Sequence, residues 1–396
     1  MPPRLPDSLL HFPHAALPPL GVYLHWPFCA AICPYCDFNV HLLRDGDDNN
    51  VALWQAAYAR ELDYAFSLRP QGPVETVFFG GGTPSLMSPD LVGAILNAVD
   101  ARWGLAPDAE ITLEANPMSA PEAHLRDLRA AGVTRLSLGV QAFDDAALKK
   151  LGRTHSADDA RTAFAAAQAI FPHASFDLIY ARPNQSVADW QRELQAALAL
   201  GPQHMSLYQL TIEPDTPYAR LAAAGKLIVP DEDKAAALYE VTQELTQVVG
   251  LNAYEISNHA VPDHACRHNV ASWQGGDYIG LGPGAHGRVS NAYGRSATQG
   301  VKDPQSWLAA VDANGHGWTT MQKLDAEDMA AEAVMLGLRL IDGLALADLE
   351  ARGVRLDAAQ LEAGRADGLL TSDETRLQAS PEGRLLLDYL LGRLLA

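Results

Sequence analysis

Between about residues 20 and 210, the chain alternates short apolar runs with longer stretches of helical periodicity. Helical spacing of apolar residues is clear in residues 89–102 and 157–170. Strands that alternate with helices predict βα units and a parallel sheet. Such a sheet either stays open and doubly wound or curls into a partial barrel, and periodicity alone does not choose between them. The six runs with strand character are residues 21–26, 74–79, 110–114, 135–140, 176–180 and 205–209.

Polar residues gather where these runs end. In either architecture, active sites form at the carboxyl ends of parallel strands, because those ends share one edge of the sheet. The sequence therefore predicts a site at this edge. The groups found there are a cysteine loop, Gly80-Gly81-Gly82-Thr83, Glu114, Gln141 and Asp177.

The cysteine loop is the strongest chemical signal. Cys29, Cys33 and Cys36 fall within eight residues, and three thiolates at this spacing can hold three irons of a 4Fe–4S cluster. The fourth iron would stay open to bind a small molecule, as in catalytic metal sites. A zinc site completed by His25 is the alternative. Cys266 lies far along the chain and is expected to be a lone thiol.

The other polar groups at this edge are individually weak signals. Gly81, Gly82 and Thr83 follow a strand and lack the Gly-Lys-Ser/Thr ending of a phosphate loop, so they form either a tight turn or a close ligand contact. Glu114 could accept hydrogen bonds from ribose hydroxyls or an ammonium group. Arg153 could pair with a carboxylate. Together with Gln141 and Asp177, they lie where we expect a nucleoside-bearing cofactor.

The pattern loosens after residue 210. We expect a helix at 229–250, a short strand at 253–256, and a loop-rich stretch at 257–295. That stretch contains His268 and His286 in a glycine-rich setting, which is compatible with a flat macrocycle, an iron centre or a purely structural loop. Residues 325–396 are mostly helical, with a hairpin at 369–371 and 376–378, and predict a winged-helix-like module.

Composition limits the remaining classes. The 396 residues carry a net charge of −19, which disfavours a general nucleic-acid surface. No apolar run reaches the roughly 18 residues that a membrane span needs. The first twenty residues hold six prolines without a signal-peptide pattern and read as a loose arm. Four cysteines, three of them clustered, suit a reducing cytoplasm better than a disulfide framework.

These motifs together resemble the radical S-adenosylmethionine (SAM) superfamily, and within it the oxygen-independent coproporphyrinogen III oxidase group. The resemblance implies an α/β fold, an incomplete (β/α)6 TIM-like barrel followed by the C-terminal module. We accordingly expect an arm at 1–20, the barrel at 21–250, an α/β extension at 251–320 and the helical module at 321–396. The matching motifs are Cys-x3-Cys-x2-Cys after Tyr23-Leu-His-Trp-Pro-Phe28, Gly-Gly-Gly-Thr-Pro-Ser85, Leu138-Gly-Val-Gln-Ala-Phe143, Asp177-Leu-Ile-Tyr180 and the segment from Gly280 to Gly287.

The resemblance also assigns cofactors. It implies that Cys29, Cys33 and Cys36 hold a 4Fe–4S cluster whose open iron is chelated by SAM. Tyr23 and Tyr35 would flank SAM near the cluster. The remaining expected SAM contacts are Gly81, Gly82 and Thr83 at its methionyl end, and Glu114, Gln141, Arg153 and Asp177, some of which would meet a second SAM.

Two branches of the group differ in function. The oxidases carry a cysteine where this chain has Phe38, and they have a longer N-terminal arm. Both departures resemble the haem chaperone branch, whose His-Asn-x-x-Tyr-Trp signature reads here from His268 to Trp273 with Ser272 in place of tyrosine. We therefore expect a protein that binds haem, with His268 as the leading contact, and transfers it to apo-haemoproteins.

The alternative within the group is an enzyme that cleaves SAM to decarboxylate a porphyrinogen oxidatively. The sequence leaves open whether SAM cleavage occurs, although Phe38 disfavours oxidase activity. No nucleic-acid partner is expected. A homodimer and a peripheral membrane contact through partner proteins are both compatible with the sequence.

Overall fold

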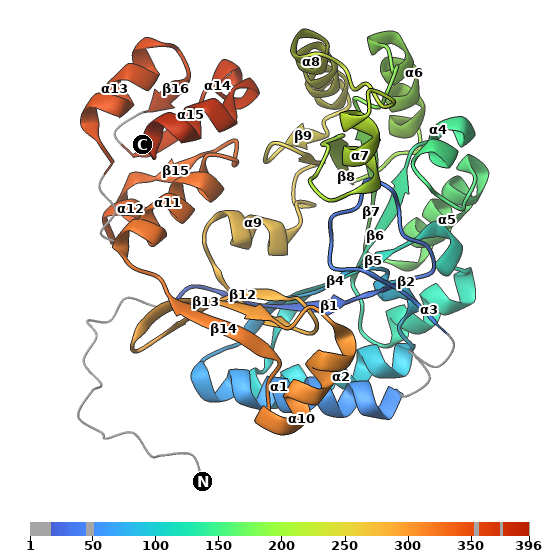
Figure 1. Ribbon diagram of the computed structural model, residues 1–396, viewed down its shortest axis with the longest axis vertical. Helices are drawn as coiled ribbons and strands as arrows, with labels where there is room; N and C mark the ends of the chain where they lie inside the picture. Colours follow the sequence, from blue (N-terminus) through green and yellow to red (C-terminus); the bar gives the residue numbers. More distant parts are fainter. Residues whose placement is uncertain (1–16, 45–50, 352–355, 373–374, 396) are drawn as a thin grey trace.

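The computed structural model describes residues 17–44, 51–351, 356–372 and 375–395. Six parallel strands follow one another around a curved sheet: β1 (Leu20–Trp26), β4 (Val74–Gly81), β5 (Leu105–Ala115), β6 (Arg135–Gln141), β7 (His173–Tyr180) and β8 (His204–Gln209). All six predicted strands are thus confirmed. The sheet has β14 and β9 at its two edges among the described residues, so the barrel is incomplete, as expected (Figure 1).

Helices cover the outside of this sheet (Figure 1). Strand side chains such as Leu113 and Phe176 are fully buried, because a parallel sheet is covered on both faces. Ser88 and Ser156 begin two of the helices, each accepting a backbone N–H with its side chain. The helices are α1 (Val51–Leu68), α2 (Pro89–Trp103), α3 (Glu122–Ala130), α4 (Asp145–Lys150), α5 (Ala157–Ile170) and α6 (Val187–Leu198).

The chain then leaves the repeating pattern. The predicted helix at 229–250 is confirmed as α8 (Glu232–Val248), which begins after the capping residue Asp231. In place of one strand at 253–256, the chain forms β9 (Asn252–Ala253) and β10 (Asn258–Ala260), which pair with each other. The prediction was wrong here because the chain turns back on itself between two very short strands. Helix α7 (Pro217–Ala223) precedes α8.

The expectation of a loop-rich stretch at 257–295 was also wrong. It contains the short helix α9 (Arg267–Trp273) and strand β11 (Asp277–Leu281), which pairs in parallel with β1. Strands β12 (His286–Asn291), β13 (Gly294–Gly300) and β14 (Trp318–Lys323) then extend the same sheet as an antiparallel meander. These strands were not predicted because glycine is uncommon inside strands and the segment is rich in glycine. Gly280 is required because a Cβ there would lie 2.0 Å from the His286 carbonyl oxygen.

The C-terminal module has its own core around Val334, Leu377 and Leu390. The predicted hairpin is confirmed, since β16 (Leu370–Ser372) pairs antiparallel with β17 (Arg376–Ala379), which also pairs with β15 (Leu344–Ala345). No helix in the described part of the chain is long and apolar enough to span a membrane. The module's helices are α11 (Ala326–Gly337), α12 (Leu346–Ala351), α13 (Ala358–Ala366), α14 (Pro381–Leu385) and α15 (Leu387–Leu394), and α10 (Pro304–Asn314) precedes them.

The four expected segments remain predictions as domain boundaries. Residues 1–16 of the arm expected at 1–20 lie outside the described residues. Strands β11 to β14 of the 251–320 segment continue the barrel sheet, so this segment and the barrel share one core.

Candidate functional site

The cysteine loop leaves the carboxyl end of β1. It begins in β2 (Phe28–Cys29) and returns in β3 (His41–Leu42), which pairs in parallel with β2. The Cys36 backbone N–H donates to the Cys33 carbonyl at 3.2 Å, which turns the loop between the last two thiols. All three cysteines are free; Cys29 and Cys33 are buried and Cys36 is half-buried.

This donor set fits an iron–sulfur cluster better than a zinc ion. His25, which a zinc site would need, has both ring nitrogens engaged, one with the Tyr23 hydroxyl at 3.0 Å and the other with the Asn39 carbonyl at 2.9 Å. Within the described ranges, no three His, Cys, Asp or Glu side chains converge closely enough to hold one metal ion. A cubane needs no such convergence, because each thiolate binds a different iron.

The glycine turn after β4 packs against the start of the cysteine loop. The Gly82 N–H donates to the Trp26 carbonyl at 2.7 Å, and the Thr83 N–H donates to the Phe28 carbonyl at 2.9 Å. A Cβ on Gly82 would lie 2.6 Å from that Phe28 oxygen, so only glycine allows this approach. The Thr83 hydroxyl then donates to the Cys29 sulfur at 3.4 Å.

Arg153 holds the loop from its other side. It follows Gly152, whose φ of 72° places the turn against Pro34. The Arg153 guanidinium donates to the Cys33 sulfur at 3.4 Å and to the Gly139 carbonyl at 2.7 Å. Its Nε is buried without a hydrogen-bond partner among the described residues. Arg153 thus ties the cysteine loop to strand β6, which carries Gly139.

Two carboxylates face the loop from β5 and β7, the strands on either side of β6. Glu114 on β5 accepts one backbone hydrogen bond, from the Gly81 N–H at 3.2 Å, and burial followed by repulsion from Asp177 raises its pKa to about 8. Burial also raises the pKa of Asp177, on β7, to about 6, although its carboxylate accepts a hydrogen bond from the Ser137 hydroxyl at 3.3 Å. Buried acids with so few partners are typical of ligand sites.

These groups line one cavity of about 150 Å³ at the carboxyl edge of the sheet. Gln141 also lines it, with a φ of 71° and a buried amide oxygen that lacks a partner among the described residues. Ser137 and Gly139 line it too and were missed, since nothing in their local sequence marks them, and Asn116, which follows a predicted strand, was not assigned to the site. The predicted residues that meet there are Cys29, Cys33, Cys36, Tyr35, Gly81, Gly82, Thr83, Glu114, Gln141, Arg153 and Asp177.

Tyr23 lies outside this lining. Its ring stacks on Phe78 at 6.2 Å between centroids, and its hydroxyl contacts the His25 ring instead of the cavity. The pKa of Tyr23 is raised by burial and by the nearby Glu114 carboxylate.

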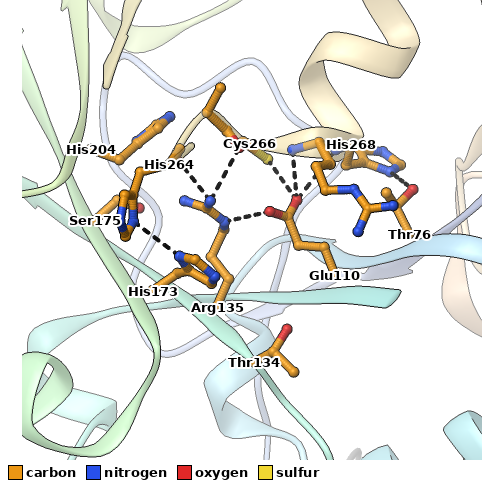
Figure 2. A network of polar contacts seen from close by, with 12 residues as sticks. Thr76, Glu110, Thr134, Arg135, His173, Ser175, His204, His264, Cys266 and His268 are labelled. Carbon is orange, nitrogen blue, oxygen red and sulfur yellow. Dashed lines mark hydrogen bonds and ion pairs between the residues drawn. The ribbon is translucent and has the colours of Figure 1, made fainter. Parts of the chain in front are cut away.

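His268 lies at the opposite, amino end of the strands (Figure 2). Its Nδ1 is 3.1 Å from the Thr76 hydroxyl, and its ring lies 4.9 Å from that of Phe78. Burial lowers the pKa of His268 to about 4, so the ring is neutral. The structure therefore does not bring His268 to the cysteine cavity.

A buried ion pair fixes the segment that carries His268. The Glu110 carboxylate is 2.8 Å from Arg135 Nε, and it accepts the backbone N–H of Arg267 at 2.8 Å and that of His268 at 3.3 Å (Figure 2). Arg135 in turn donates to the His264 carbonyl at 2.9 Å. Helix α9 is thus anchored across the amino end of the barrel.

Comparisons with known proteins agree with this architecture. Residues 23–197 match the model of the radical SAM superfamily, and residues 324–386 match the HemN C-terminal domain. The solved structure of coproporphyrinogen III oxidase (HemN) from Escherichia coli superposes with a TM-score of 0.79, covering 98% of this chain and 92% of that one. At 22% identity, this likeness supports the fold alone.

Similar curated proteins extend over nearly the whole chain. The mouse protein named radical S-adenosyl methionine domain-containing protein 1, mitochondrial, is 39% identical over 97% of this chain and 89% of its own length. The haem chaperone HemW of Mycobacterium tuberculosis is 38% identical, covering 95% of each chain. HemW of Escherichia coli is 36% identical over 96% of this chain and 99% of its own. The chain therefore belongs to the radical SAM superfamily, in the family that contains the bacterial haem chaperones HemW.

Proposed function

We propose that this protein is a haem chaperone that carries a 4Fe–4S cluster and SAM, binds haem and passes it to apo-haemoproteins. The observation that carries the proposal is the extent of the similarity to HemW proteins. It spans 95–96% of this chain, and so includes α9 and the C-terminal module as well as the barrel.

The residues of the cavity fit the two family cofactors. Cys29, Cys33 and Cys36 would hold three irons, and the open iron would take the amino and carboxylate groups of SAM. A cluster with bound SAM supplies one-electron reductive chemistry at the sulfonium when it is reduced. Arg153 donates to the Cys33 sulfur and the Thr83 hydroxyl donates to the Cys29 sulfur, so both side chains would hydrogen-bond to cluster ligands.

The cavity's acids and amide are suited to the rest of SAM. Glu114 and Asp177 can accept hydrogen bonds from an ammonium group or from ribose hydroxyls, and each has spare acceptor capacity. An approaching cation would lower the raised pKa of Glu114 and ionise it. Gln141 presents a buried amide oxygen without a hydrogen-bond partner among the described residues, and a ligand donor could satisfy it.

The residue at position 38 supports a carrier over a porphyrinogen oxidase. Phe38, 61% exposed, lines this cavity where the oxidase branch places another cysteine. Behind the cavity, Tyr23, Phe78 and His268 fill the interior of the barrel.

His268 as the haem contact stays a prediction. Its ring is buried and hydrogen-bonded to Thr76, so haem could reach it only if α9 moved away from the barrel. A reducing compartment, a homodimer and transfer to apo-haemoproteins are likewise expectations from the sequence. The mouse relative is named as mitochondrial, so the compartment needs its own test by fractionation.

The decisive experiment combines two assays on anaerobically reconstituted protein with about four irons per chain. In the first, haem is titrated and the loaded protein is mixed with apomyoglobin; we expect stoichiometric haem binding followed by transfer. In the second, reduced protein is incubated with SAM and coproporphyrinogen III; we expect no protoporphyrinogen. Oxidase turnover without haem binding would overturn the proposal.

A further inference from the structure

The glycine-rich segment from Gly280 to Gly287, here called the glycine segment, connects β11 to β12. Its sequence alone is compatible with a ligand site or with a structural loop. None of its residues, all of which the structure describes, lines the cavity that holds the cysteines. The glycine segment instead contacts the cysteine loop directly, through the side chain of Asn39.

Asn39 joins three parts of the molecule. Its amide nitrogen donates to the Pro283 carbonyl at 3.0 Å and to the Lys302 carbonyl at 2.8 Å. Its backbone carbonyl accepts a hydrogen bond from His25 Nε2 at 2.9 Å. The half-buried Asn39 thus ties the cysteine loop to β1 and to two backbone segments that lie far along the chain.

The glycine segment is shaped to receive this amide. A Cβ on Gly284 would lie 2.5 Å from Asn39 Nδ2, and Gly284 has a φ of 76°. Only glycine combines this backbone angle with so close a side chain. The Gly284 N–H also donates to the Val301 carbonyl, and the Gly300 N–H donates to the Ala285 carbonyl, both at 2.8 Å. The two segments that Asn39 reaches are therefore bonded to each other.

A buried carboxylate fixes the glycine segment to the outer helices. Glu61 of α1 is fully buried and accepts the Gly282 N–H at 2.8 Å. It also accepts the Gly317 N–H at 2.8 Å and the indole N–H of Trp307 at 3.1 Å. Trp307 belongs to α10, which packs against α1 (Figure 1). Asn39 therefore holds the cysteine loop to a part of the core that is itself fully bonded.

Cys36 lies between two contacts that hold the cysteine loop. Before it, the Pro34 carbonyl accepts the Tyr218 N–H of α7 at 3.0 Å, and after it comes Asn39. Burial raises the pKa of Cys36 to about 11, and a backbone hydrogen bond from Phe38 opposes this rise. Because Phe38 precedes Asn39 directly, a shift of Asn39 would also move this donor. Hydrogen bonds to the sulfurs of a cluster tune its reduction potential.

We propose that Asn39 is a positioning residue for the cluster, which fastens the cysteine loop to the glycine segment and so determines how firmly the loop retains iron. The inference rests on the proposed 4Fe–4S cluster and gives the glycine segment a role at that site. A loop held in this way loses less conformational freedom when it binds the cluster. Residues that orient metal ligands typically contribute about 10–100-fold to metal affinity.

The test is the rate at which the reconstituted full-length protein releases iron to a chelator without air. Asn39→Ala removes both amide donors, and we expect about tenfold faster release. The EPR spectrum of the reduced cluster, with and without SAM, should change as well. The matched control is Asn291→Ala, which removes a half-buried side chain that accepts the Tyr293 N–H at 2.9 Å in the β12–β13 turn. It should match the wild type in both measurements, and thermal unfolding confirms that each variant is folded.

A second pair of variants disturbs the same contact from the other side. The methyl group of Gly284→Ala would displace the Asn39 amide and should also speed iron release. Its control is Gly315→Ala, which has a φ of 80° but no atom within 4 Å of the added methyl, so it has the backbone strain without the clash. The double variant Asn39→Ala/Gly284→Ala should release iron more slowly than the product of the two single effects predicts, because both substitutions break one contact.

Wild-type iron release and an unchanged EPR spectrum in Asn39→Ala would overturn the inference. Single effects that multiply fully in the double variant would do the same. A wild type that assembles no cluster would overturn it together with the cofactor on which it rests. Faster iron release in Asn39→Ala and in Gly284→Ala, from a wild type that binds no haem, would support the inference and refute the chaperone function alone.

Discussion

Strand β5 carries two glutamates four residues apart, Glu110 buried and Glu114 half-buried, and their surroundings differ sharply. Glu110, at the amino end, is paired with Arg135 and also accepts the Cys266 thiol and two backbone N–H groups of α9. Glu114, toward the carboxyl end, has one backbone donor, the Gly81 N–H. The same side chain thus has two different roles on one strand. The hydrogen-bond acceptors of Glu110 are occupied by contacts that stabilise the fold, whereas those of Glu114 are mostly free to accept from a ligand.

The cysteines also divide between the two ends of the barrel, and their substitution should give the largest effect, a loss of the cluster. Cys29→Ala, Cys33→Ala or Cys36→Ala should each abolish cluster assembly, because a cubane held by two thiolates loses a third of its protein ligands. Iron and sulfide analysis after anaerobic reconstitution measures this. Cys266→Ala is the matched control, since its thiol lies at the amino end beside Glu110, and it should retain a full cluster. Equal iron loss in all four variants would show that the thiol at the amino end matters for the cluster as much as the three in the cysteine loop.

The two glutamates should respond oppositely to substitution. Glu110→Ala leaves Arg135 buried without its partner and should cost about 3–5 kcal/mol of unfolding free energy. Glu114→Gln removes a poorly solvated acid and should leave stability unchanged or higher, while weakening SAM binding about tenfold, a loss of roughly 1.4 kcal/mol. Denaturant unfolding and calorimetric SAM titration separate these outcomes. A destabilised Glu114→Gln that bound SAM normally would reverse the assignment.

The raised pKa of Glu114 predicts a pH dependence of stability. The folded protein keeps a proton up to about pH 8 that the unfolded chain releases above about pH 4.5. The contribution of Glu114 to stability is therefore full below pH 4.5, falls as the pH rises toward 8, and is constant beyond that. Asp177 acts in the same direction between about pH 3.8 and 6. In protein without cluster or SAM, Glu114→Gln should flatten the slope between pH 5 and 8 measured by denaturant unfolding.

The smallest expected change in stability comes from the contact between α9 and strand β4. Thr76→Val removes the hydroxyl that contacts His268 and should cost about 1 kcal/mol. Cluster content should stay at the wild-type level, because Thr76 lies at the amino end of β4. Hydrogen exchange of the α9 amides should increase more than that of β5. Unchanged protection in α9 would mean that Glu110 and Arg135 alone hold the helix.

Several features followed from the sequence because their signals are local. Apolar runs of five or six residues specified the six barrel strands, and the spacing of Cys29, Cys33 and Cys36 specified the ligand loop. Glu114, Gln141 and Asp177 could be placed together from their positions in the chain, since the ends of parallel strands share one edge. The C-terminal hairpin was also predictable, because its two strands lie close together in the chain.

Other features arise only in the folded protein, because they depend on contacts between distant residues. Strand β11 is glycine-rich and becomes a strand through pairing with β1, more than 250 residues earlier in the chain. Ser137 and Asn116 line the cysteine cavity through the curvature of the sheet, which no local pattern encodes. His268 and Trp273 belong to one motif, yet the packing of α9 sets His268 against Thr76 of the barrel and Trp273 against Arg339, which follows α11. Sequence periodicity records which faces are buried, but the identity of the partner on each face is fixed only when the chain folds.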